Sequence, residues 1–214
     1  FKDIFKKMEH QGKNITELTD TIPEDKQIPS AEYASSYDPH IWFDISLWKT
    51  VTKYAAARLS RFDPENKEFY QKNKQDYLTR LDTLQNYVKS MIEKVPEQQR
   101  ILITAHDAFN YFGKAYGFEV LGLQGISTAS EAGVKDVQNL ADVIAENNIK
   151  AIFIETSVPK RNIQALQKSV EAKGFEVKIG GELFSDALGS PGSEEGTYIG
   201  MFRHNINTIV NALK

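Results

Sequence analysis

The segment ILITAHDAFNYFGKAYGFEVLGL, residues 101–123, has the pattern of a strand, a helix and a second strand. Residues 101–104 and 118–123 are mostly apolar, and the apolar positions of residues 108–116 between them have helical spacing. Continuous apolar strands joined by a helix are typical of parallel sheets that are buried on both faces. This segment therefore predicts the first strand-helix-strand unit of an α/β domain.

The same alternation continues to the end of the chain. Two more apolar strands are predicted at residues 151–154 and 175–179. The helices that separate and follow these strands are predicted at residues 135–147, 160–173 and 197–213. Residues 97–214 thus predict a complete lobe, with a mostly parallel sheet covered by helices on both faces.

A long helix is predicted ahead of this lobe. Asp63-Pro64 is a typical helix start, and apolar residues then recur at alternating spacings of four and three. The stripe consists of Tyr77, Leu81, Leu84, Val88, Met91 and Val95. A helix over residues 64–95 would be about 45 Å long at 1.5 Å per residue. We interpret it either as a coiled-coil arm or as a rod that packs along two lobes and connects them.

The first part of the chain has the pattern of the end of another lobe. Its expected elements are helices at residues 1–8 and 45–61, a short strand at 14–22 and an ordered loop at 23–39. Because no capping residue precedes the first helix, we expect the chain to begin inside a domain. The expected organisation is an incomplete N-terminal lobe, a linker helix and a C-terminal α/β lobe, at residues 1–62, 63–96 and 97–214.

The composition excludes several classes of protein. The 214 residues are 41% hydrophobic and 26% charged, and 26 Lys and Arg against 29 Asp and Glu give a net charge of -3. A near-neutral chain without a basic block does not favour nucleic acid as a partner. No apolar run reaches the ~20 residues that cross a bilayer, and no signal peptide is visible. Because cysteine is absent, a tight metal site must use His, Asp and Glu.

Two polar side chains are expected near the carboxyl ends of the strands, where ligands bind in open parallel sheets, and a third lies in a segment outside this sheet. His106 follows the first strand, and Asp186 lies in the loop after the fourth. His40 lies in the segment DPHIWFD, which starts the helix at residues 45–61. Two imidazoles and a carboxylate suit a divalent cation such as Zn²⁺ or Mn²⁺.

Each of these residues also has a structural interpretation. A His at a strand end, such as His106, is more often hydrogen-bonded than metal-binding. His40 would then belong to a helix start capped by Asp38 or Asp44, and Asp186 would be a turn residue. Two further histidines fit the structural interpretation alone: His10 and His204. No HExxH, GxSxG, phosphate-loop or GxGxxG motif occurs, so protease, α/β-hydrolase and nucleotide-binding functions lack support.

Several motifs occur in an order that points to one family. They are DPHIWFD (38–44), TAHDAFNYFGKAYGFEV (104–120), LQGISTASEAG (123–133), AIFIETSVP (151–159), GGELFSDALG (180–189) and GTYIGMFRHNINTIV (196–210). Together they resemble the zinc- and manganese-binding solute-binding proteins of ABC transporters, the TroA-like cluster A-I, over essentially the whole chain. The resemblance implies two (β/α) lobes joined by a long rigid linker helix, with the metal bound between the lobes.

The resemblance also implies roles for single residues. It makes His40, His106 and Asp186 metal ligands, and Glu131 a candidate partner that orients a ligand imidazole. A surface Glu at a helix start is the alternative for Glu131. Relatives contribute a further His from the first lobe, in a segment that would precede Phe1, so we expect this chain to lack that ligand. Some relatives have a carboxylate at the place of His106, and the imidazole shifts the balance toward Zn²⁺ without excluding Mn²⁺.

The sequence therefore predicts an extracytoplasmic protein that captures Zn²⁺ or Mn²⁺ and delivers it to an ABC transporter permease, and that is not an enzyme. The metal would be cargo, and any membrane attachment would come from an upstream lipid anchor. A metal-dependent hydrolase and a surface adhesin of the same fold are the alternatives. We also expect the incomplete lobe to weaken metal binding and to promote self-association.

Overall fold

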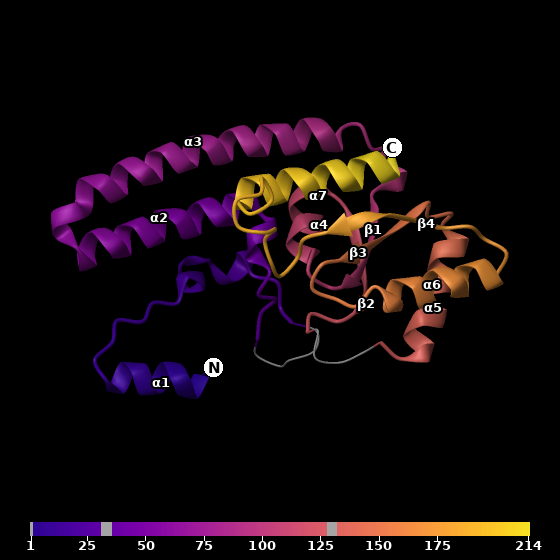
Figure 1. Ribbon diagram of the computed structural model, residues 1–214, viewed down its shortest axis with the longest axis horizontal. Helices are drawn as coiled ribbons and strands as arrows, with labels where there is room; N and C mark the ends of the chain where they lie inside the picture. The colour runs from indigo at the N-terminus through magenta and orange to yellow at the C-terminus, as the bar shows by residue number, and fades with distance from the viewer. Residues whose placement is uncertain (1, 31–35, 128–131) are drawn as a thin grey trace.

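The computed structural model describes residues 2–30, 36–127 and 132–214, and Figure 1 labels its helices and strands. The α-helices are α1 (Lys2–His10), α2 (Ile45–Phe62), α3 (Lys67–Ile92), α4 (Asn110–Tyr116), α5 (Val134–Glu146), α6 (Arg161–Ala172) and α7 (Tyr198–Leu213). The strands are β1 (Ile101–His106), β2 (Glu119–Gln124), β3 (Ala151–Glu155) and β4 (Lys178–Leu183). Short 3₁₀ turns are η1 (Leu18–Thr21), η2 (Glu24–Lys26), η3 (Ile41–Phe43), η4 (Pro64–Asn66) and η5 (Glu97–Gln99).

The strands form two parallel pairs that lie side by side, which confirms the predicted α/β class. β1 pairs with β2, β3 pairs with β4, and β1 packs beside β3 in the middle. The carboxyl ends of the strands face the segment that leads into α2 (Figure 1). Loops that follow the strands therefore meet the first part of the chain at this edge.

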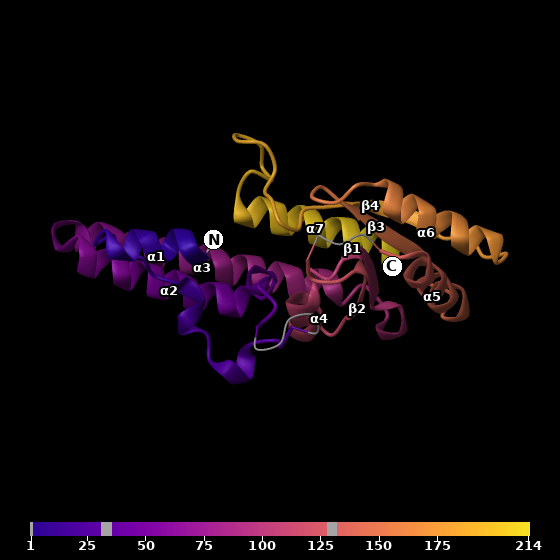
Figure 2. The same cartoon turned by 90° about the horizontal axis from the view of Figure 1, so that it is seen from below.

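Helices cover both faces of the strands, and neighbouring strand residues alternate between two cores. Leu102 and Phe153 belong to the core built with α3, α4 and α7. Ile103 and Ile152 belong to the core built with α5 and α6. Figure 2 shows α4 and α7 on one side of the strands and α5 and α6 on the other. The prediction of helices on both faces is confirmed.

The fourth strand lies later in the sequence than predicted. β4 covers Lys178–Leu183 rather than residues 175–179, and the Gly180-Gly181 pair lies inside the strand. A Cβ at position 180 would lie 2.7 Å from an alanine of α7 and 2.8 Å from the Phe153 ring. Glycine therefore allows α7 to pack directly on the strand. Gly181, at φ +146°, accommodates the irregular register opposite Phe153.

The long helix is confirmed, but it is shorter at both ends than the predicted range 64–95. α3 begins at Lys67 because Pro64–Asn66 form the turn η4. The carboxylate of Asp63, just before this turn, accepts bonds from Asn66 and Tyr70. α3 runs antiparallel to α2 and lies along α7 (Figure 1), so it is not a free coiled-coil arm. Its fully buried apolar residues include Leu81, Leu84 and Val88.

The segment before α2 corrects one prediction. Within the described residues it contains no strand, so the strand predicted at residues 14–22 is wrong. Arg58 of α2 donates to Thr16 Oγ1 at 3.0 Å, so a side chain rather than a neighbouring strand holds this polar segment. The division of the chain at residues 1–62, 63–96 and 97–214 stays a prediction. Among the described residues, no helix is both long and apolar enough to span a membrane.

Candidate metal centre

Three side chains with metal-binding atoms meet where the strand ends face the start of α2. His40 precedes η3, His106 ends β1, and Asp186 lies in the loop after β4. One ligand atom from each lies within 4.8 Å of the other two, and this is the one group of its kind in the described part of the chain. The structure thus brings together the three residues selected from the sequence.

His40 is held by the carboxylate of Asp38. Asp38 Oδ1 accepts a bond from the His40 backbone N–H at 2.9 Å and lies 2.6 Å from the ring Nδ1. Asp38 Oδ2 accepts a further bond from Asn110 Nδ2 at 3.1 Å. Both His40 and Asp38 are buried. A proton on Nδ1 leaves the lone pair of Nε2 free, so this arrangement presents Nε2 to a ligand.

Glu155 holds His106 in the same way. Glu155 is the last residue of β3, and its Oε1 accepts a bond from the His106 backbone N–H at 2.9 Å. Its Oε2 lies 2.7 Å from the ring Nδ1, at ion-pair distance but outside straight hydrogen-bond geometry. Neither side chain has exposed surface. Among the described residues, the buried Nε2 of His106 has no hydrogen-bond partner, so its lone pair is available to a bound cation.

Asp186 completes the group from a loop. Its Oδ1 lies 3.4 Å from His40 Nε2, and its Oδ2 lies 3.4 Å from His106 Nε2. The Asp186 side chain is 35% exposed, whereas the two imidazoles are at most 3% exposed. A cavity of about 460 Å³ adjoins His40 and Asp186, and Trp42 and Ile126 also line it. Asp186 is thus the member of the group that solvent reaches.

The carboxylates favour positive charge on the imidazoles when no cation is bound. Burial opposes the charged form of His106, but Asp186 and Glu155 outweigh it and raise the pKa to about 9. Burial likewise opposes the charged form of His40, while Asp186 and Asp38 raise its pKa above the ordinary value. His106 and His40 in turn hold the pKa of Asp186 well below its usual range. The group therefore stabilises positive charge at its centre.

The geometry fits one small divalent cation. Donor atoms bound to a tetrahedral cation at about 2.0–2.2 Å lie about 3.4 Å from one another. Asp186 Oδ1 lies at this distance from His40 Nε2, and Asp186 Oδ2 lies at this distance from His106 Nε2. Zn²⁺ and Mn²⁺ both accept imidazole and carboxylate donors. Three protein ligands leave further positions for water or another donor.

Sequence reasoning missed the two carboxylates that orient the imidazoles. The sequence suggests Asp38 and Asp44 only as alternative caps of the helix start. Of the two, Asp44 does cap α2. It did not name Glu155, although a carboxylate at the end of an apolar strand beside the strand of His106 is a usable signal. Glu131, the candidate orienting partner, lies outside the described residues.

The remaining histidines lie apart from the group. His10 is exposed at the end of α1. His204 lies in α7, and its Nε2 is 2.9 Å from the backbone carbonyl of Glu182. Neither belongs to a metal-binding group of the described residues.

A family model described as zinc-uptake complex component A, periplasmic, matches residues 1–212 of the chain. The chain belongs to this family. Membership in the zinc-uptake family confirms the resemblance that the motifs from DPHIWFD to GTYIGMFRHNINTIV indicated.

Individual members of the zinc-uptake family are similar to this chain over nearly all of its length. The manganese-binding lipoprotein MntA of Bacillus subtilis is 45% identical over 213 residues, which cover 100% of this chain and 69% of MntA. The zinc-binding protein TroA of Treponema pallidum is 46% identical over 211 residues, which cover 99% of this chain and 68% of TroA. The solved structure of periplasmic TroA from Treponema pallidum matches with a TM-score of 0.94 and 45% identity, covering 99% of this chain and 75% of that one.

These comparisons confirm the predicted fold of the family and the prediction that the chain is not an enzyme. The relatives that share the fold are named as binding proteins. The alternative of a metal-dependent hydrolase finds no support among them.

Proposed function

We propose that this chain is the extracytoplasmic substrate-binding component of an ABC transporter, which captures Zn²⁺ or Mn²⁺ and delivers it to the membrane permease. The observation that carries the proposal is the group formed by His40, His106 and Asp186, whose donor atoms lie within 4.8 Å of one another, close enough to share one cation. Membership in a family described as a periplasmic component of zinc uptake supports it.

Zn²⁺ and Mn²⁺ are both proposed as the cargo. MntA of Bacillus subtilis is named for manganese and TroA of Treponema pallidum for zinc, at nearly the same identity to this chain. Two imidazoles and one carboxylate are donors that Zn²⁺ prefers, whereas more oxygen donors would favour Mn²⁺. We therefore expect tighter binding of Zn²⁺ by the ligands on this chain.

The contacts within the group favour capture over catalysis. A general base needs a carboxylate or imidazole that is free to accept a proton from the reacting group. Asp38 and Glu155 are already committed to the Nδ1 atoms of the imidazoles, and Asp186 is a proposed ligand. These carboxylates orient the ligands and balance the charge of the cargo.

The arrangement of the elements suits a receptor with small internal motion. α3 packs along both α2 and α7, so we propose that residues 63–96 form a rigid connection between two lobes. Attachment to the membrane through a lipid anchor, as in relatives named lipoproteins, is part of the same proposal. An adhesin of the same fold would not depend on metal, and metal binding therefore separates the two functions.

The test is metal titration of the protein purified without chelators, with Zn²⁺ and Mn²⁺ in turn. We expect binding of one ion per chain and a rise in the midpoint of thermal unfolding, because the ion binds the folded state. His106→Ala should weaken binding by at least about tenfold. His10→Ala, which removes an exposed histidine outside the group, is the control and should bind as the wild type does. Equal affinity of the two variants would remove His106 from the site, and no binding by the wild type would overturn the proposal.

A further inference from the structure

The three proposed ligands differ in how the protein holds them. His40 and His106 are buried, and each is fixed by a carboxylate that contacts its ring and its backbone N–H. Asp186 lies in the irregular segment between β4 and α7, and its side chain is 35% exposed. Asp186 is therefore the proposed ligand that solvent already reaches and that no carboxylate among the described residues holds in place.

The residues just before Asp186 are held by hydrogen bonds from two directions. Asn205 of α7 bonds both backbone groups of Phe184, accepting from its N–H at 3.0 Å and donating to its carbonyl at 2.7 Å. The Trp42 indole N–H donates to the carbonyl of the next residue, Ser185, at 3.1 Å. Ser185 is buried, so the loop passes from a fixed backbone to an exposed carboxylate within one residue.

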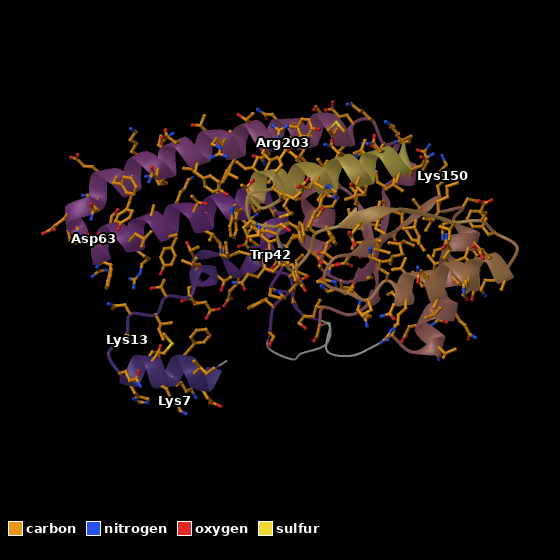
Figure 3. All side chains as sticks on the ribbon, viewed as in Figure 1. Lys7, Lys13, Trp42, Asp63, Lys150 and Arg203 are labelled. Atoms are coloured by element: carbon orange, nitrogen blue, oxygen red, sulfur yellow. The ribbon has the colours of Figure 1, made fainter. Side chains whose placement is uncertain are left out.

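Trp42 is itself fixed, and it belongs to the same turn as a proposed ligand. Its backbone carbonyl accepts a bond from the Tyr198 hydroxyl at 2.7 Å. Its ring contacts the His40 ring edge to face, with 5.2 Å between centroids. Figure 3 places Trp42 near the first turns of α2 and α7. The indole therefore connects the segment of His40 to the loop of Asp186.

We propose that Trp42 is a positioning residue, whose indole N–H bond to the Ser185 carbonyl holds Asp186 against the two imidazoles and slows release of the metal. The inference rests on the proposed function, and it concerns the rate of release rather than the identity of the ligands. Loss of one such neutral hydrogen bond corresponds to roughly a 3- to 10-fold faster dissociation. Association should change little, because both imidazoles keep their carboxylate partners.

The sequence offers a matched control for the experiment. It has two tryptophans, and the second, Trp48, donates its indole N–H to the Tyr77 hydroxyl at 3.2 Å. Trp42→Phe and Trp48→Phe make the same chemical change, one beside Asp186 and the other along α2. The phenyl ring in Trp48→Phe keeps a ring against Tyr198, on which Trp48 stacks.

The test measures release of Zn²⁺ from each variant into an excess of a chromophoric chelator by stopped flow. Hydrogen exchange of the amides of residues 184–188 is followed in parallel on the metal-free protein. We expect Trp42→Phe alone to release Zn²⁺ about 3- to 10-fold faster and to exchange faster in this loop, with wild-type exchange elsewhere.

The outcomes distinguish the role of Trp42 from the proposed function. Wild-type release and loop exchange in Trp42→Phe would overturn the role of Trp42 and leave the proposed function intact. Equal acceleration in Trp48→Phe would also overturn it, since the effect would then be one of general stability. A wild-type chain that binds neither Zn²⁺ nor Mn²⁺ would overturn the proposed function itself. If Trp42→Phe does not fold, Trp42→Tyr, which also lacks the indole N–H, is measured with the same expectations.

Discussion

His40 and His106 lie on different elements, but each imidazole is oriented by a carboxylate in the same way. In each case a buried carboxylate accepts the backbone N–H and lies against the ring Nδ1, so that Nε2 faces Asp186. The arrangement fixes both the ring orientation and the tautomer that a cation needs. Asp38 lies two residues from His40 in the sequence, whereas Glu155 reaches His106 because β3 packs beside β1.

The charge of Asp186 is predicted to matter more than its shape. Asp186→Asn keeps the size of the side chain but removes the negative charge between two imidazoles. We expect metal affinity to fall at least about tenfold while circular dichroism stays unchanged. Loss of secondary structure in this variant would instead favour the interpretation of Asp186 as a structural turn residue.

Glu155→Gln should impair binding although Glu155 does not contact the metal. The amide oxygen can still accept the His106 backbone N–H, but the amide N–H₂ then faces Nδ1 and favours the tautomer with its proton on Nε2. We expect about a 10- to 100-fold loss of affinity, measured by competition with a chelator. Glu176→Gln, which changes an exposed carboxylate between α6 and β4, is the control and should have wild-type affinity. Wild-type affinity in Glu155→Gln would show that this carboxylate does not orient His106.

Metal binding should release protons at neutral pH. The pKa of His106 is raised to about 9 and that of His40 is also raised, so the metal must displace protons from the imidazoles. Apparent affinity should therefore rise between pH 6 and pH 8, and calorimetry in buffers of different ionisation enthalpy should detect the released protons. Binding without proton release at pH 7 would contradict this prediction.

The metal-free protein should show the opposite trend in stability. Because the pKa of His106 in the folded state lies above its ordinary value of 6.5, the protonated ring stabilises the fold. This contribution is complete below about pH 6.5 and is lost as the pH rises through about 9. Urea unfolding of the metal-free chain across this range measures it, and His106→Ala should remove most of the dependence.

At the scale of elements, periodicity predicted the helices and three of the strands, because each buries one apolar face or run. The wrong predictions fall where contacts with distant parts of the chain, and not the local residue pattern, determine the structure. β4 extends to Leu183, beyond the predicted end at residue 179, because the absence of a Cβ at position 180 allows α7 to pack on this strand. Residues 14–22 were assigned to a strand, but polar contacts such as Arg58 to Thr16 hold them instead. The contact of Glu155 with His106 joins two strands, so Glu155 becomes a candidate partner only once these strands are placed side by side.

The start of α2 offers a test of one such element. The Asp44 carboxylate accepts bonds from the backbone N–H groups of Ser46 and Leu47, and it directly follows the turn η3. Asp44→Ala should lower the free energy of unfolding by about 1 kcal/mol, measured by urea titration. Asp25→Ala, which changes an exposed carboxylate of η2, should leave this free energy within experimental error of the wild type. Equal stability of both variants would mean that water satisfies these backbone groups as well as Asp44 does.

At the scale of the whole molecule, the metal group depends on one core that spans distant parts of the chain. Buried residues from α2, α3, the strands and α7 belong to the same cluster. This continuity brings His40 to the strand ends that carry His106 and precede Asp186. The far end of the α2–α3 pair differs, because large apolar side chains there face solvent: Leu59, Phe62 and Phe69.

These exposed side chains predict self-association of the chain. Phe62 is 68% exposed and Phe69 is 62% exposed, and exposed apolar side chains of this size favour contact with a second apolar surface. Light scattering should therefore show a mass that rises with protein concentration. Phe62→Ser combined with Phe69→Ser should reduce that rise and leave Zn²⁺ affinity unchanged, because both residues lie at the end of α2–α3 remote from His40. A monodisperse monomer at every concentration would show that this surface does not associate.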